Sequence, residues 1–321
     1  MRLALLAGSL ESVRHSSIKQ AASRKVRFSA LHHETYAYLS HKRIHRFLTT
    51  RVTPIDLRYE CQHPASGNNT DKPLVILHGL FGMKRNWLSL AKAFCKELQR
   101  PIYSLDLRNH GASPHVEPMN YDVMATDVLH FIESHSLTNV SLLGHSMGGK
   151  AAMALALSPQ LPEGLLQHLI VADIAPSRGR LSKEFQSYVR AMQEIESAHV
   201  KTRQEAQHIL SPYEPDPMTR AFLLTNLDTS ATPLRFRIPL DILGSAIPAL
   251  GDFPYEPGER TWTGKTLFIK GTKSRYINER NLPIAKQFFP NMELKTLAAG
   301  HWVHAEKPTE FLRYVIDFIK E

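Results

Sequence analysis

VSLLGHSMGGKAAMALAL, residues 140–157, joins an apolar run to an alanine-rich run through Gly144-His145-Ser146-Met147-Gly148. The first run is typical of a strand that is buried on both faces of a sheet. The second run is rich in alanine and leucine, which favour a helix. The stretch therefore predicts a strand, a sharp turn and a helix, with Ser146 at the turn.

A serine at such a turn has the position of a nucleophile. A serine hydroxyl reacts poorly until a base removes its proton, and the resulting oxyanion needs hydrogen-bond donors. Flanking glycines permit a strained backbone at Ser146 and a close approach of helix and strand. The backbone N–H of Met147 would then face the oxyanion at a helix N-terminus. We interpret Ser146 as a nucleophile; the alternative is a serine that caps an ordinary helix.

Strand and helix patterns alternate on both sides of this stretch, which predicts the α/β class with a mostly parallel sheet covered on both faces. The alternation stops over about residues 177–263, where helical patterns and then Pro- and Gly-rich segments predict a helical cap insertion. At 321 residues the chain is long enough for one large α/β domain, which we place at residues 54–321. Strands are predicted within 55–62, 74–79, 101–106, 140–145, 168–173, 266–271 and 293–302, and helices within 86–100, 121–137, 147–157, 278–289 and from about 308.

The first 53 residues differ from the rest in charge. They contain ten Lys or Arg and two Glu, a net charge of +8 out of the whole chain's +9. The predicted domain therefore lacks a basic surface for nucleic acid. An acid-poor stretch rich in Arg and Ser is typical of a mitochondrial transit peptide, and the alternative is a disordered basic tail without an address. We expect a mitochondrial protein, in the matrix or associated with the inner membrane.

Membrane, metal and disulfide signals are missing from the sequence. No apolar run of about 18 residues occurs, so no transmembrane segment is expected. The two cysteines, Cys61 and Cys95, have neither a metal-binding spacing nor a disulfide pattern, which is typical of a reducing compartment. No His-Glu-x-x-His motif occurs, so no metal ligands are predicted.

Two further motifs precede this stretch in the chain: HGLFG at 78–82 and DLRNHGAS at 106–113. With GHSMGG they make residues 54–321 resemble the α/β-hydrolase superfamily. The resemblance implies an α/β-hydrolase fold, in which the Leu80 backbone N–H joins that of Met147 in the oxyanion hole. It also implies that Asp106 and His110 brace a structural loop and do not react.

The base should be a histidine in a loop after the last strand. AAGHWVHAEKP, residues 298–308, offers His301 and His304. His301 directly follows Gly300, as in the Gly-His pair of the superfamily, so we predict His301 as the base. His304 is predicted to begin the helical side of the loop.

The acid is harder to place, because GTKSRYINER, residues 271–280, has no aspartate where the superfamily usually has one. Glu279 is the nearest carboxylate, and we expect it to open the following helix. A neutral residue would not stabilise the imidazolium that forms during attack. Asp173 ends an apolar run one strand earlier, and neighbouring strands are about 5 Å apart. Asp173 is therefore the predicted acid; the alternative is that it only caps the entrance to the cap.

Together, HGLFGMKRNW, DLRNHGASPH, GHSMGGKAAMALAL, VADIAP and GHWVHAEKP resemble one subfamily. It contains α/β-hydrolase-domain-containing protein 11, bacterial esterases of the YbfF type and the yeast ethanol acetyltransferases. The resemblance implies use of the early aspartate and, for eukaryotic members, a mitochondrial location.

Two enzymatic functions and one binding function fit this resemblance. The first is a serine hydrolase acting on esters or thioesters through an acyl-serine intermediate. The second is an alcohol acetyltransferase with acetyl-CoA as acyl donor and ethanol as acceptor, and the third is a non-catalytic partner of a mitochondrial complex. Neither enzyme needs a cofactor, and no motif specifies the acyl group, the acceptor or the oligomeric state.

Overall fold

The computed structural model describes residues 53–321, so the predicted leader lies outside the described residues except for Thr53. The described part contains a seven-stranded sheet in the order β1-β3-β2-β4-β5-β8-β9. β1 pairs antiparallel with β3, and the other neighbours pair in parallel, which confirms the predicted mostly parallel sheet. The strands are β1 (Tyr59–Gln62), β2 (Leu74–Leu77), β3 (Ile102–Leu105), β4 (Val140–His145), β5 (Leu166–Ala172), β8 (Lys265–Gly271) and β9 (Met292–Leu297).

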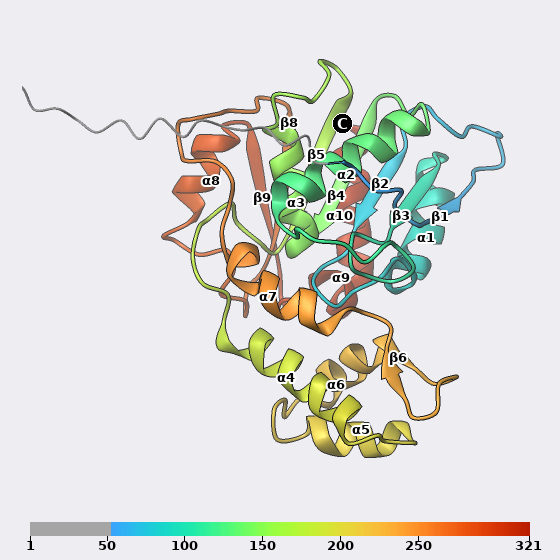
Figure 1. Ribbon diagram of the computed structural model, residues 1–321. Helices are drawn as coiled ribbons and strands as arrows, with labels where there is room; N and C mark the ends of the chain where they lie inside the picture. The colour runs from blue at the N-terminus through green and yellow to red at the C-terminus, as the bar shows by residue number, and fades with distance from the viewer. Residues whose placement is uncertain (1–52) are drawn as a thin grey trace, which may run out of the picture. The chain divides into compact units, whose positions relative to one another are not determined.

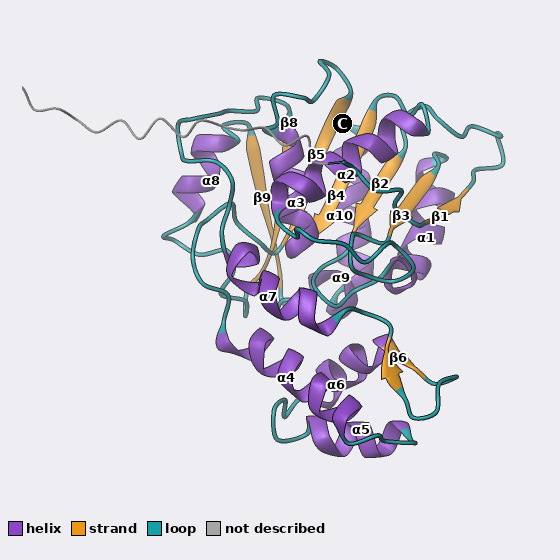
Figure 2. Cartoon of the chain, in the orientation of Figure 1, coloured by secondary structure: helices purple, strands orange, loops and turns teal. Residues whose placement is uncertain are grey.

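Helices cover both faces of this sheet (Figure 2). Side chains alternate along each strand, so Val75 and Leu77 of β2 pack on one face, and Leu74 and Ile76 on the other. The first face carries α2 (Tyr121–Ser134), α3 (Met147–Ala156) and α8 (Leu282–Phe288). The second carries α1 (Leu88–Leu98), after the 3₁₀ turn η1 (Lys84–Trp87), and α10 (Pro308–Lys320), after the short α9 (Val303–Glu306). These two apolar layers form the core of the α/β domain.

A mainly helical cap separates β5 from β8 and lies beside the carboxyl ends of the central strands (Figure 1). It consists of α4 (Lys183–Ser197), α5 (Arg203–Leu210), α6 (Pro217–Leu223), η2 (Leu224–Asn226), β6 (Leu227–Asp228), β7 (Arg235–Phe236) and α7 (Leu240–Gly251). The sequence pattern predicted the first three helices and described the rest of the insertion only as Pro- and Gly-rich, without placing a helix at α7. Leu243, Ile247 and Leu250 are buried at helical spacing, and this burial outweighs the Pro248 inside the helix.

Buried hydrogen bonds attach both ends of the cap to the domain. The ammonium of Lys150, on α3, donates to the Ser177 carbonyl at 2.8 Å and to the Gly251 and Asp252 carbonyls at 3.0 and 2.8 Å. Near the middle of the cap, the Asn226 amide donates to the Phe81 carbonyl at 2.8 Å. The cap is therefore held against the same helix that begins after Ser146.

None of the helices in the described part of the chain combines the length and hydropathy that a membrane crossing requires.

Candidate active site

Ser146 stands between β4 and α3 with φ 52° and ψ −117°, a backbone conformation that residues other than glycine rarely adopt. A Cβ on Gly144 would lie 2.2 Å from the Gly148 carbonyl oxygen. A Cβ on Gly148 would lie 2.5 Å from the carbonyl oxygens of Leu77 and His78. At these two glycines the backbones of β4, α3 and the end of β2 lie too close together for a Cβ atom. The predicted strand, turn and helix around Ser146 are confirmed.

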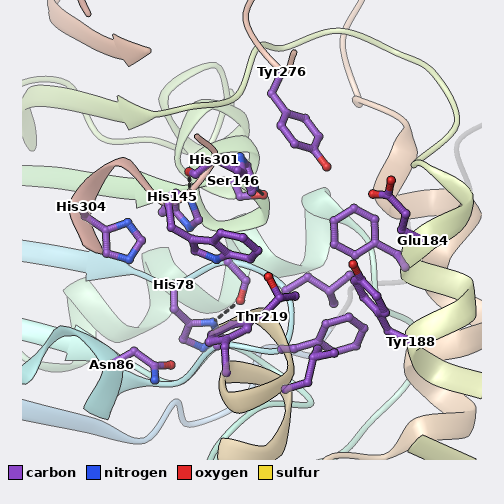
Figure 3. A pocket seen from close by; sticks show the side chains of 18 of the residues that line it. His78, Asn86, His145, Ser146, Glu184, Tyr188, Thr219, Tyr276, His301 and His304 are labelled. Carbon is purple, nitrogen blue, oxygen red and sulfur yellow. Dashed lines mark hydrogen bonds between the residues drawn. The ribbon is translucent and has the colours of Figure 1, made fainter. Parts of the chain in front are cut away.

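The structure brings the three residues of the predicted triad into one chain of hydrogen bonds. The Ser146 Oγ lies 2.9 Å from His301 Nε2, and His301 Nδ1 lies 2.8 Å from Asp173 Oδ2. Figure 3 shows Ser146 and His301 side by side. Asp173 directly follows β5, and β5 pairs with β4 so that Ala172 is opposite His145. Ser146 and Asp173 consequently leave adjacent strands at the same level of the sheet edge.

Asp173 is fully buried and has partners on both carboxylate oxygens. Oδ1 accepts a hydrogen bond from the Gly271 N–H at 2.9 Å, and Oδ2 accepts one from the Ser274 hydroxyl as well as from His301. These donors offset the cost of burying a charge. Ser274 lies in the segment where the superfamily usually has its acid, so a hydroxyl there supports a carboxylate from the neighbouring strand. Ser274 is visible in GTKSRYINER, but the sequence analysis did not predict its contact with Asp173.

Glu279 is exposed in a turn, and the expectation that it opens the next helix was wrong. α8 begins at Leu282, with Pro283 in its first turn. The Asn278 side-chain oxygen accepts the backbone N–H groups of Arg280 and Asn281 at 3.0 and 3.2 Å. This side-chain-to-backbone bonding favours a turn over a helix, so the helix starts later than predicted.

His145, within the turn itself, contacts the predicted base through the backbone. Its Nε2 lies 2.9 Å from the His301 carbonyl oxygen, so Nε2 carries a proton and donates it. Burial lowers the pKa of His145 well below its ordinary value, which keeps the ring neutral. His145 therefore fixes the backbone of His301 independently of the triad, a contact that no sequence pattern indicated.

The HGLFG loop after β2 is held by two imidazoles. His78 Nε2 accepts the Leu107 N–H at 3.0 Å, and His110 Nε2 accepts the Phe81 N–H at 3.1 Å. Asp106 accepts the backbone N–H groups of Lys84 and Ala112 at 2.7 and 2.9 Å. Both residues predicted to brace this region, Asp106 and His110, thus form bracing contacts.

The two predicted oxyanion donors come from different segments. Leu80 lies in the HGLFG loop after β2, and Met147 directly follows Ser146 as the first residue of α3. Within residues 53–321, neither backbone N–H donates a hydrogen bond to another group of the protein. Both groups are therefore available to a bound substrate.

A cavity of about 270 Å³ opens above Ser146 and His301, between the domain and the cap (Figure 3). This volume lies just below the range of about 300–1,000 Å³ for small-molecule sites. The cap contributes one part of the lining, including Glu184, Phe185, Tyr188 and Phe222. The apolar part of the lining comes from Leu80, Phe81, Trp87, Phe185, Phe222 and Trp302.

Cys61 and Cys95 are free thiols, and burial raises the pKa of Cys61 to about 11. Within residues 53–321, no group of three or more His, Cys, Asp or Glu side chains has an arrangement that could hold a metal ion.

The strand order, the serine turn and the hydrogen-bonded Ser–His–Asp chain define a class of enzymes, and comparison with known proteins agrees. The chain belongs to the alpha/beta hydrolase fold family, whose model matches residues 72–308. With its curated relatives, this membership makes the protein an ester hydrolase or an acyltransferase.

Particular relatives carry both activities in their names. The chain is 39% identical to a probable alcohol acetyltransferase of Saccharomyces cerevisiae, over 86% of each chain. It is 36% identical to the sn-1-specific diacylglycerol lipase ABHD11 of Xenopus laevis, over 84% of this chain and 85% of the relative. Among solved structures, a marine microorganism esterase is 35% identical with a TM-score of 0.73, covering 82% of this chain and 99% of that one.

Proposed function

We propose that this protein is a serine hydrolase that cleaves esters or thioesters through an acyl intermediate on Ser146. The observation that carries the proposal is the continuous hydrogen-bond chain from the Ser146 hydroxyl through His301 to the buried Asp173, with distances of 2.9 and 2.8 Å. Ser146 and His301 both line the cavity between the domain and the cap. A nucleophile, a base and an orienting carboxylate are the parts that acyl transfer requires.

In the first half of the reaction, His301 Nε2 takes the Ser146 proton as Oγ attacks the substrate carbonyl. The oxyanion accepts hydrogen bonds from the Leu80 and Met147 N–H groups, each worth about 2.7–4 kcal/mol in comparable enzymes. Asp173 stabilises the imidazolium, which then gives its proton to the leaving alcohol or thiol. In the second half, water loses a proton to His301 and attacks the acyl-serine; the bond to Oγ breaks, His301 returns the proton to Ser146 Oγ, and the acid is released.

Alcohol acetylation is the second candidate, because a relative at 39% identity is named a probable alcohol acetyltransferase. Here an alcohol such as ethanol replaces water in the second half, and acetyl-CoA serves as the acyl donor. Acetyl-CoA is then a substrate, and the chemistry of the triad needs no cofactor. Whether water or the alcohol attacks the acyl-serine depends on how well the cap excludes water from it.

The two functions are separated by product analysis of the full-length protein. Acetyl-CoA or ethyl acetate is supplied with and without ethanol, and acetate and ethyl acetate are quantified by gas chromatography. We expect acetate release that is lost in Ser146→Ala. Ethyl acetate formed from acetyl-CoA and ethanol, also dependent on Ser146, would establish the transferase. Absence of any Ser146-dependent product would favour a non-catalytic partner of a mitochondrial complex.

We also propose a mitochondrial location, in the matrix or at the inner membrane, directed by residues 1–53. The support is their net charge of +8, since acid-poor, Arg- and Ser-rich leaders are typical of mitochondrial import. Residues 1–53 fused to a fluorescent protein should reach mitochondria, and replacing four of their arginines with glutamine should abolish import. A fusion that stays in the cytosol would contradict the proposal.

A further inference from the structure

The charged groups that line the active-site cavity all have one sign. Glu184 and Glu214 are among its lining residues, and no lysine or arginine of the described chain is. Glu184 is exposed in the first turn of α4, whereas Glu214 is buried just before α6. Both carboxylates belong to the cap, whereas Ser146 and His301 belong to the α/β domain.

The histidines of the lining do not offset these two negative charges. His78, His145 and His304 all line the cavity, and all three are buried. Burial lowers the pKa of each ring, that of His304 to about 3, so all three are neutral at pH 7. Even the single positive charge that His301 gains when it takes the serine proton is smaller than the charge of the two carboxylates. At rest, the cavity is therefore net negative.

The tyrosine side chains of the lining, Tyr188 and Tyr276, stay protonated and are therefore neutral. The Tyr188 hydroxyl donates to Glu214, whose other oxygen accepts the Asp216 N–H at 2.7 Å. Burial, reinforced by the charge of Glu184, raises the pKa of Tyr276 to about 12. Figure 3 shows the Tyr276 hydroxyl directed toward the Glu184 carboxylate, and the Tyr276 ring packs on the His301 ring with centroids 4.1 Å apart.

We infer that the cavity selects its substrates by charge, with Glu184 as a specificity determinant. It accepts acyl and leaving groups that are neutral or cationic inside the cavity, and it disfavours those that carry a carboxylate or phosphate there. An enclosed anion would lose its hydration and meet two carboxylates without a positive partner. The inference rests on the proposed function. For acetyl-CoA it means that the phosphates stay outside the mouth.

The test compares two esters with four-carbon acyl groups, p-nitrophenyl butyrate and mono-p-nitrophenyl succinate, which differ by one carboxylate. We expect the wild-type kcat/KM for the succinate ester to be at least tenfold lower than for the butyrate ester. In Glu184→Gln this ratio should shift at least threefold toward the succinate ester. Glu194→Gln, an exposed carboxylate on the same helix outside the cavity, is the matched control and should leave the ratio unchanged.

Equal turnover of the two esters by the wild type, or an unchanged ratio in Glu184→Gln, would overturn the inference. A lack of Ser146-dependent turnover of the butyrate ester would contradict the proposed function instead. Charge selection is then read from binding alone, by quenching of tryptophan fluorescence with butyramide and with succinamate, because Trp87 and Trp302 line the cavity. Weaker binding of succinamate supports the inference, and equal binding overturns it.

Discussion

Replacing Asp173 with asparagine preserves the size of the side chain and removes its charge. The carboxylate accepts hydrogen bonds from His301 Nδ1 at 2.8 Å, from the Gly271 N–H at 2.9 Å and from the Ser274 hydroxyl. An asparagine must place its NH₂ group where one of the two oxygens was, so a donor faces a donor in either orientation. If the NH₂ group faces the Gly271 N–H, both buried donors are left without an acceptor. If it faces His301, it forces the imidazole into the other tautomer.

The second outcome removes catalysis, because a proton on His301 Nε2 prevents this atom from accepting the Ser146 proton. In serine enzymes of known mechanism, the same change lowers kcat by about 10⁴-fold. At 1.36 kcal/mol per factor of ten, this loss is about 5.4 kcal/mol of transition-state stabilisation. Asp173 does not line the cavity, so we expect KM to stay within about threefold of the wild-type value.

The assay is steady-state hydrolysis of p-nitrophenyl butyrate by wild type, Asp173→Asn and Glu279→Gln. Glu279 is the matched control, because it is the exposed carboxylate in the segment where the superfamily usually has its acid. We expect a loss of about 10⁴-fold in Asp173→Asn and a change of less than twofold in Glu279→Gln. Circular dichroism checks that both variants fold. Near-full activity in Asp173→Asn, with activity abolished in Glu279→Gln, would refute the assignment.

Three other perturbations follow from single contacts. His145→Ala removes the 2.9 Å bond to the His301 carbonyl, so kcat should fall about tenfold, and a change below twofold would contradict this role. Burial lowers the pKa of His304 from 6.5 to about 3, so the free energy of unfolding falls as pH drops below 6.5. In His304→Phe, urea unfolding should show this pH dependence reduced by about 1.4 kcal/mol per pH unit. An unchanged pH dependence would exclude this account. Lys150→Met leaves three carbonyls at the cap ends without their donor, which should cost about 3 kcal/mol and lower Tm by about 6–12 °C; a calorimetric Tm within 2 °C of wild type would count against it.

The fold and the central hydrogen-bond chain could be predicted because they depend on regular patterns. Parallel strands end at one edge of a sheet, so residues that follow adjacent strands lie near one another. This rule placed Asp173 beside Ser146 although the usual late acid is missing from residues 271–280. The pairing of His145 with Ala172 provides the required register.

The supporting contacts could not be predicted, because each depends on how loops meet in space. Ser274 is 101 positions from Asp173, and His145 is 156 positions from His301. No period or spacing in the sequence connects such pairs. The sequence did not place the helix α7 for a related reason, since its Pro248 is unfavourable in a helix and its packing against α4 stabilises it.

The most direct test of the account is covalent labelling of the folded full-length protein with a fluorophosphonate, followed by peptide mass spectrometry. The probe reacts with a serine that a neighbouring base activates, and it requires no knowledge of the natural substrate. The account predicts a single phosphonyl adduct on the peptide that contains Ser146, absent in Ser146→Ala and greatly slowed in His301→Ala. A folded protein that stays unlabelled, or an adduct that persists in Ser146→Ala, would contradict it.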